Sequence, residues 1–283
     1  MFVNFAVAFL PSYFEVHMAK VKKKTTPITQ RSEKKFKHSS KETAKLIRRY
    51  HVLNKELAKC RSSNDREKEQ QILAEMEAMG GLDWYQRASQ LGQSKSRGGD
   101  SSKWLLQKLE KHGYKGGEEK LRLLEIGAVA PDNYDKVKSW ITVLPIDLNP
   151  QDPRIKKQDF LEMKPTEKFD VLSLSLVVNF VGDPKDRGKM LLHTRDFLDG
   201  PHRLLYLVLP LPCITNSRYM SHEHLITMMT AMGYSCIEHH FSKKLAYYLF
   251  HLENVNKRYQ PFKKTLLPDK QGGNRNNFCI VIE

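Results

Sequence analysis

Short apolar runs alternate with amphipathic stretches along the second half of the chain. Continuous apolar runs are typical of strands buried on both faces, as in a parallel sheet covered by helices. Helical spacing is found at 185–199 and 221–232, and a shorter helix is predicted from Trp104 to about Gly113. Because the last strands follow one another without a long helix, we expect an antiparallel edge. The runs predicted as strands are 121–126, 140–146, 169–176, 203–209, 234–241, 245–251 and 277–282.

The first half of the chain has a different pattern, which predicts a helical hairpin with one apolar face. The first helix is expected to begin at Ser39 and Glu42, which have capping-box spacing. A polar break at 62–65 separates the two helices, and glycines at 80–81 end the second. The apolar positions are Leu46, Ile47, Tyr50, Leu53 and Leu57 in the first helix and Ile72, Leu73, Met76 and Met79 in the second.

Charge changes this picture at the N-terminal end. The net charge is +15, and residues 20–60 hold 14 Lys and Arg against 3 Asp and Glu. A basic segment with few large apolar residues is expected to be disordered alone and to contact a polyanion such as RNA, or to serve as a nuclear-import signal. We therefore predict a basic arm at 1–38, a helical extension with a glycine-rich connector at 39–103, and an α/β domain at 104–283. Residues 1–17 lack the basic start and cleavage site of a signal peptide.

The connector at 81–103 interleaves Trp84 and Tyr85 with arginines, lysines and glycines. Aromatic rings next to cations suit stacking on bases and pairing with phosphates. An equally good interpretation is a plain connector whose tryptophan caps the core.

Metal, disulfide and membrane functions are disfavoured by the sequence. The four cysteines have no CxxC spacing, and the histidine pairs lack the spacing of metal ligands. We therefore expect no metal, a reducing compartment and no membrane association. We also expect a monomer.

Candidate ligand-binding residues follow the first two predicted strands. The first strand ends at Glu125, Ile126 and Gly127, and a glycine there lets a ligand approach the backbone closely. The second ends at Asp147, about 20 residues after Gly127, where a carboxylate can accept hydrogen bonds from ribose hydroxyls. The alternative for Asp147 is a turn carboxylate ahead of Pro150.

Two further pairs of residues extend this candidate site. Asp159 and Phe160 follow a short extended stretch and suit the edge and face of an adenine. Asn179 and Phe180 follow the 169–176 strand, where Asn179 can read a base edge and Phe180 can stack on a flat substrate. The alternative for Asn179 is that it satisfies backbone groups of the next loop.

The glycine pattern indicates which cofactor fits. The sequence Gly127-Ala128-Val129-Ala130-Pro131 is not G-x-G-x-x-G, so consecutive amides for a pyrophosphate are not expected. A nucleoside cofactor without phosphates fits better, and S-adenosylmethionine is the obvious candidate.

The sequences of these motifs resemble those of a known family. LLEIG at 123–127, PIDL at 145–148, QDF at 158–160 and SLSLVVNFV at 173–181 look like class I methyltransferase motifs. With RGGDSSK at 97–103, they are most similar to fungal large-subunit (25S) rRNA adenine-N1 methyltransferases. The resemblance covers about residues 40–283.

The resemblance implies a Rossmann-like α/β fold and S-adenosylmethionine as cofactor, in contact with Gly127 and Asp147. We also predict Glu125, Asp159 and Phe160 as cofactor-binding residues. It also implies N1-methylation of an adenine in rRNA or a pre-ribosome, in the nucleus and nucleolus. Asn179 and Phe180 are the candidate catalytic residues. Two alternatives stay open: a cofactor-sensing regulatory protein without methyltransferase activity, like the animal relatives of this family, and a methyltransferase acting on a protein or a small molecule.

Overall fold

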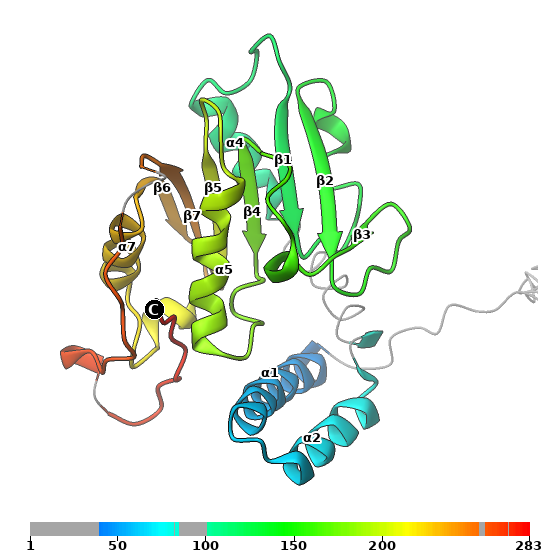
Figure 1. Cartoon of the computed structure of the whole chain (residues 1–283), viewed down its shortest axis with the longest axis vertical. Helices are drawn as coiled ribbons and strands as arrows, with labels where there is room; N and C mark the ends of the chain where they lie inside the picture. The colour runs from blue at the N-terminus through cyan, green and yellow to red at the C-terminus, as the bar shows by residue number, and fades with distance from the viewer. Residues whose placement is uncertain (1–39, 82, 85–100, 255–257, 271) are drawn as a thin grey trace, which may run out of the picture. The chain divides into compact units, whose positions relative to one another are not determined.

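The computed structural model describes residues 40–81, 83–84, 101–254, 258–270 and 272–283 (Figure 1). The part from Ser40 to Glu283 forms one compact unit. The predicted basic arm at 1–38 and most of the glycine-rich connector lie outside the described residues, so the predicted division of the chain stays a prediction.

A seven-stranded sheet has the order β3-β2-β1-β4-β5-β7-β6. The pairs β1–β2, β2–β3, β1–β4 and β4–β5 are all parallel. The order reverses at β1, so the carboxyl ends of β1, β2 and β4 flank the switch point at which open α/β sheets bind ligands. The strands are β1 (Leu121–Ile126), β2 (Ile141–Asp147), β3 (Lys156–Lys157), β4 (Val171–Ser175), β5 (Leu204–Pro210), β6 (Tyr234–Phe241) and β7 (Leu245–Leu252).

The antiparallel edge predicted from the sequence is confirmed. Strand β7 pairs antiparallel with both β5 and β6. Strand β6 therefore runs in the same direction as β5, and the β6–β7 hairpin turns at the carboxyl edge of the sheet.

Helices cover both faces of the sheet, as predicted. Helix α4 (Ser102–Lys111) packs on one face, and α5 (Pro184–Phe197) and α7 (His222–Ala231) pack on the other (Figure 1). Neighbouring strand residues enter opposite layers, as with Leu123 and Leu124. The remaining short helical elements are α6 (Pro212–Thr215), η1 (Asp135–Val137), η2 (Phe160–Glu162) and η3 (Pro268–Lys270).

The N-terminal extension is the predicted helical hairpin. Helix α1 (Ser40–Ser62) and α2 (Arg66–Ala78) are separated by the expected polar break, and the Asp65 carboxylate caps α2 by accepting from Lys68 N at 3.2 Å. The apolar face buries its own small core, although Leu73 stays exposed. The buried members are Tyr50, Leu53, Leu57, Cys60, Ile72 and Met76.

The C-terminal segment corrects one prediction. The apolar run 277–282 is not a strand of the sheet, and among the described residues its β pairing is limited to a single bridge between Phe262 and Ile282. Residues 278–282 are nevertheless buried, because they pack against α5. Val281 N donates to Pro184 O at 2.9 Å, at the start of α5. A buried apolar run has the same composition whether it pairs in a sheet or lies over a helix.

A buried arginine on α5 holds this segment to the loop that follows β4. The Arg187 side chain is 1% exposed. Its guanidinium donates to Val181 O at 2.8 Å, to Gly182 O at 3.1 Å and to Cys279 O at 2.6 Å. Among the described residues, no carboxylate forms an ion pair with it, so three backbone carbonyls take the place of a counter-ion.

We expect Arg187→Ala to lower the free energy of unfolding by about 3 kcal/mol or more, because it removes the donor shared by three backbone carbonyls in a site where the guanidinium is buried. Arg187→Lys should recover only part of the loss, since an ammonium cannot match the planar fork. Urea unfolding measures both. Lys189→Ala, which removes an exposed cation of the same helix, is the control and should change stability by about 0.5 kcal/mol or less. An equal effect at positions 187 and 189 would contradict this account.

Candidate cofactor and substrate site

The turn that follows β1 brings a glycine to the carboxyl edge of the sheet. Gly127 adopts a φ of 74°, in the left-handed region. A Cβ there would lie 2.6 Å from Val177 Cγ2, so a side chain would press against the loop that follows β4. Glu125, inside β1, is 8% exposed and accepts from Asn133 Nδ2 at 2.9 Å.

This turn does not form a phosphate cradle. Gly127 N and Ala128 N both donate to Ile146 O, at 2.9 and 3.0 Å, so these amides are engaged within the fold. Between β1 and β2, where every residue is described, the one helical element is the three-residue η1. A phosphate-binding loop needs consecutive amides at the start of a helix. The geometry therefore agrees with the sequence argument against a dinucleotide cofactor.

The end of β2 places a carboxylate and an apolar side chain together at the same edge. Asp147 is half-buried, and its Oδ1 accepts from Asn149 N at 2.7 Å. The next residue, Leu148, is 51% exposed. A carboxylate can accept more than one hydrogen bond, so Asp147 can also serve ribose hydroxyls. Leu148 offers an apolar surface to the flat base of a nucleoside.

Asp159 and Phe160 occupy different surroundings. Asp159 caps η2, and its Oδ1 accepts from Leu161 N at 2.8 Å. Phe160 is 3% exposed, and its ring packs against His193 and Phe197 in the core. Their predicted contact with the cofactor stays a prediction, and the structure gives Phe160 a packing role.

The turn that follows β4 carries Asn179. We call residues 177–182 the post-β4 turn. It begins after Leu176, which has a left-handed φ of 62° although it is not glycine. A leucine in this conformation stores strain, as residues next to functional sites often do. Within the turn, Asn179 Oδ1 is buried and accepts no hydrogen bond from the described residues. A buried amide oxygen without a donor is destabilising, so a ligand that supplies an N–H would satisfy it.

Helix α1 contacts the post-β4 turn. The Phe180 ring stacks on Tyr50, with centroids 6.0 Å apart and planes at 7°, and meets His51 edge-on at 5.5 Å. Asn54 Nδ2 donates to Phe180 O at 2.8 Å. The sequence predicted Asn179 and Phe180 but missed these three partners. The available signal was an asparagine four residues after Tyr50, on the same face of α1.

The imidazole of His51 is neutral at physiological pH in this environment. Burial, together with the positive charges of Lys55 and Arg187, lowers the pKa of His51 to about 4. A neutral ring next to the post-β4 turn adds no charge to it.

Both ends of the glycine-rich connector also reach the carboxyl edge of the sheet. Asp83 Oδ1 accepts from Asn149 Nδ2 at 2.8 Å, next to the end of β2. Ser101 Oγ lies 2.7 Å from Ser175 Oγ, the last residue of β4. The predicted cations of the connector lie outside the described residues, apart from Lys103 in α4.

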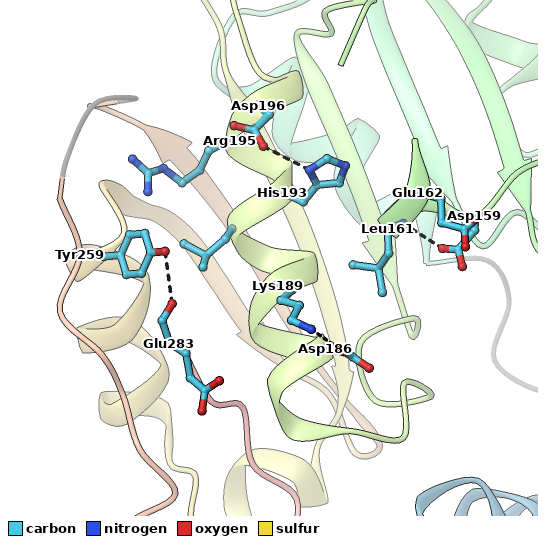
Figure 2. A pocket seen from close by; sticks show the side chains of 11 residues that line it. Asp159, Leu161, Glu162, Asp186, Lys189, His193, Arg195, Asp196, Tyr259 and Glu283 are labelled. Carbon is cyan, nitrogen blue, oxygen red and sulfur yellow. Dashed lines mark hydrogen bonds and ion pairs between the residues drawn. The ribbon is translucent and has the colours of Figure 1, made fainter. Parts of the chain in front are cut away.

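A separate hollow of about 730 Å³ runs along the outer side of α5 (Figure 2). Of the predicted site residues it includes Asp159 alone. Several of its charges pair with each other, as Lys189 does with Asp186 at 3.0 Å and His193 with Asp196 at 3.1 Å. Since Gly127, Asp147 and Asn179 do not line it, we treat the hollow as distinct from the candidate site.

The described residues contain no group of three or more His, Cys, Asp and Glu side chains arranged to hold a metal ion. None of their helices combines the length and the apolar character needed to span a bilayer.

Comparison with known proteins identifies the family. The family described as 25S rRNA (adenine(2142)-N(1))-methyltransferase, Bmt2, matches residues 70–280. The chain belongs to this family. A 25S rRNA adenine-N(1) methyltransferase of Schizosaccharomyces pombe is 43% identical over 246 residues, which is 83% of this chain and 90% of the relative.

Two further proteins show weaker similarity. A 25S rRNA (adenine(2142)-N(1))-methyltransferase of Saccharomyces cerevisiae is 36% identical over 216 residues, which is 75% of this chain and 63% of the relative. Among solved structures, an S-adenosylmethionine-dependent methyltransferase from Clostridium acetobutylicum is 12% identical. That similarity covers 60% of this chain and 99% of the other, with a TM-score of 0.45. The strand order described above is what establishes the Rossmann-like fold of this family member.

We expect Asp147→Ala to weaken binding of S-adenosylhomocysteine by about tenfold or more, because a carboxylate that accepts from ribose hydroxyls makes charge-assisted hydrogen bonds. Isothermal titration calorimetry measures the affinity. The control is Asp152→Ala, which removes a carboxylate of the following loop whose partner is Arg154. Unchanged affinity in Asp147→Ala, with the protein folded, would remove Asp147 from the site.

Proposed function

We propose that this protein transfers a methyl group from S-adenosylmethionine to N1 of an adenine in large-subunit rRNA. Membership of the 25S rRNA adenine-N1 methyltransferase family carries this proposal. The names of the family and of the Saccharomyces cerevisiae relative give adenine 2142 as the target of those proteins. We propose the equivalent adenine as the target here.

The residues at the carboxyl edge fit this cofactor. Asp147 would accept from the ribose hydroxyls, Leu148 would contact the adenine of the cofactor, and the turn at Gly127 would let the cofactor lie against the backbone. Glu125 supports that turn through Asn133. When bound, S-adenosylmethionine supplies a methyl group activated by its sulfonium.

Asn179 is our candidate for reading the target base. An asparagine can accept from the adenine N6 amine and donate to N7, a pairing that leaves N1 free to react. Its buried Oδ1, which accepts no hydrogen bond from the described residues, supports this role. Adenine N1 carries an in-plane lone pair, so the main task of the protein is to position it in line with the methyl group and exclude water. Phe180 is kept as a candidate for stacking on the base.

The target adenine must be unpaired when it reacts, because base pairing covers its N1 edge. Exposed cations at the same edge of the sheet suit the phosphates around such a base. Lys243 and Lys244 lie in the β6–β7 hairpin, next to Phe241, which is 38% exposed. Aromatic and basic side chains together are typical of surfaces that hold single-stranded RNA. We propose that the protein acts on the pre-ribosome in the nucleus, with the nucleolus as its main site.

The decisive experiment is mass spectrometry of the modified nucleosides of large-subunit rRNA from cells that lack the protein. We expect loss of one N1-methyladenosine, restored by the wild type and not by Gly127→Arg, whose side chain would fill the turn. An unchanged profile would overturn the proposal. If the purified protein still bound S-adenosylmethionine, that result would favour the cofactor-sensing alternative.

For the purified enzyme, we expect Asn179→Ala to lower kcat on an rRNA fragment by about 100-fold, because a positioned hydrogen-bonding group contributes about 2–3 kcal/mol in a water-excluded site. The affinity for S-adenosylhomocysteine should not change. Filter-based methylation assays and calorimetry measure the two quantities. Full activity in Asn179→Ala would show that the amide only serves the loop.

A further inference from the structure

Helix α1 touches the candidate substrate site although it lies outside the segment matched by the family. That match begins at residue 70, within α2, whereas α1 ends at Ser62. The family match therefore assigns no role to the contact between α1 and the post-β4 turn.

Helix α1 contacts the post-β4 turn through a hydrogen bond and through a close approach of the two backbones. Besides the hydrogen bond from Asn54 Nδ2 to Phe180 O at 2.8 Å, the backbone of α1 approaches Gly182. A Cβ on Gly182 would lie 2.7 Å from Asn54 O and 3.1 Å from Ala58 Cβ, so only glycine permits this approach. The two anchors lie on both sides of Val181.

The same turn is also held by α5. The Arg187 guanidinium donates to Val181 O and Gly182 O, as described above. The post-β4 turn is thus held by two elements, through a buried cation of the α/β domain and an amide of the helical extension. Asn179 lies directly before the three residues that these groups hold.

We propose that Asn54 is a positioning residue that orients Asn179 toward the target adenine, so that the helical extension completes the substrate site. This inference rests on the proposed function. In this role Asn54 acts through the carbonyl of Phe180, to which its Nδ2 donates.

The hairpin does not depend on Asn54 for its own stability. Its two helices are joined by their apolar core and by Arg49, whose guanidinium contacts both carboxylate oxygens of Glu75 at 2.7 Å. A variant at Asn54 can therefore leave α1 and α2 paired. A variant at Glu75 can loosen the pair without touching the post-β4 turn, which makes it a matched control.

The test compares Asn54→Asp with Glu75→Gln in the full chain. Aspartate has the size of asparagine but cannot donate to Phe180 O. We expect Asn54→Asp to lower kcat on an rRNA fragment by about tenfold, the effect of losing one hydrogen bond that orients a reacting group. Its affinity for S-adenosylhomocysteine should stay within about twofold of the wild type. Glu75→Gln should keep the wild-type kcat.

Hydrogen exchange gives a second readout that does not need activity. In the wild type, Phe180 N donates to Val177 O at 2.9 Å and Val181 N donates to the same oxygen at 3.3 Å. We expect faster exchange in peptides covering 177–182 for Asn54→Asp and for Gly182→Ala, and not for Glu75→Gln. If the wild type methylates no RNA, the proposed function fails and this comparison still tests the anchorage.

Two results would overturn the inference. One is wild-type kcat in Asn54→Asp. The other is an equal loss of kcat in Asn54→Asp and Glu75→Gln at matched folded fractions, which would reduce α1 to a general contribution to stability.

Discussion

The arrangement of the site depends on one buried cation that has backbone carbonyls as partners. The guanidinium of Arg187 is almost fully removed from water and donates to three carbonyls, two from the post-β4 turn and one from the C-terminal segment. Burying a charge is costly unless its hydrogen bonds are satisfied. The burial is therefore stable only when the turn and the C-terminal segment are both in place around α5. In this way one side chain links the end of the chain to the loop that carries Asn179.

At the carboxyl edge of the sheet, the backbone amides of the turn after β1 are bonded within the fold, and few polar side chains lie beside them. The amides of Gly127 and Ala128 are both used within the fold, so we propose that a ligand there is recognised by Asp147 and by exposed apolar atoms, in the space that Gly127 leaves open. Such a surface suits an uncharged ribose and a flat base better than a string of phosphates. The helical extension reaches the same edge at two points, near Asn149 through Asp83 and at the post-β4 turn through Asn54.

The sequence predicted most of the sheet because each apolar run had the length of a strand and was followed by a helix or a turn. It was wrong for 277–282, where burial against α5 imitates burial in a sheet. The sequence also predicted that Gly127, Asp147 and Asn179 share one edge of the sheet, since each follows a strand and parallel strands bring their carboxyl ends together. Asn54 was not recognised because its partner lies 126 residues away, and periodicity reports only which face of a helix is buried. Whether the phenylalanine of an Asp-Phe pair faces the core, as Phe160 does, is likewise decided by packing across elements.

The distance along the chain between these contacts has a consequence for synthesis. Helix α1 leaves the ribosome early, but the turn that it contacts is made 126 residues later. The carbonyl of Cys279, which accepts from Arg187, is made another 92 residues after that arginine. Domains can begin to fold as they emerge, yet contacts this far apart form only once both partners exist. The nascent protein can thus hold a folded helical hairpin and most of a sheet before the carbonyl of Cys279 is available to the guanidinium of Arg187. The burial of this guanidinium is therefore completed only after the segment around Cys279 has been made.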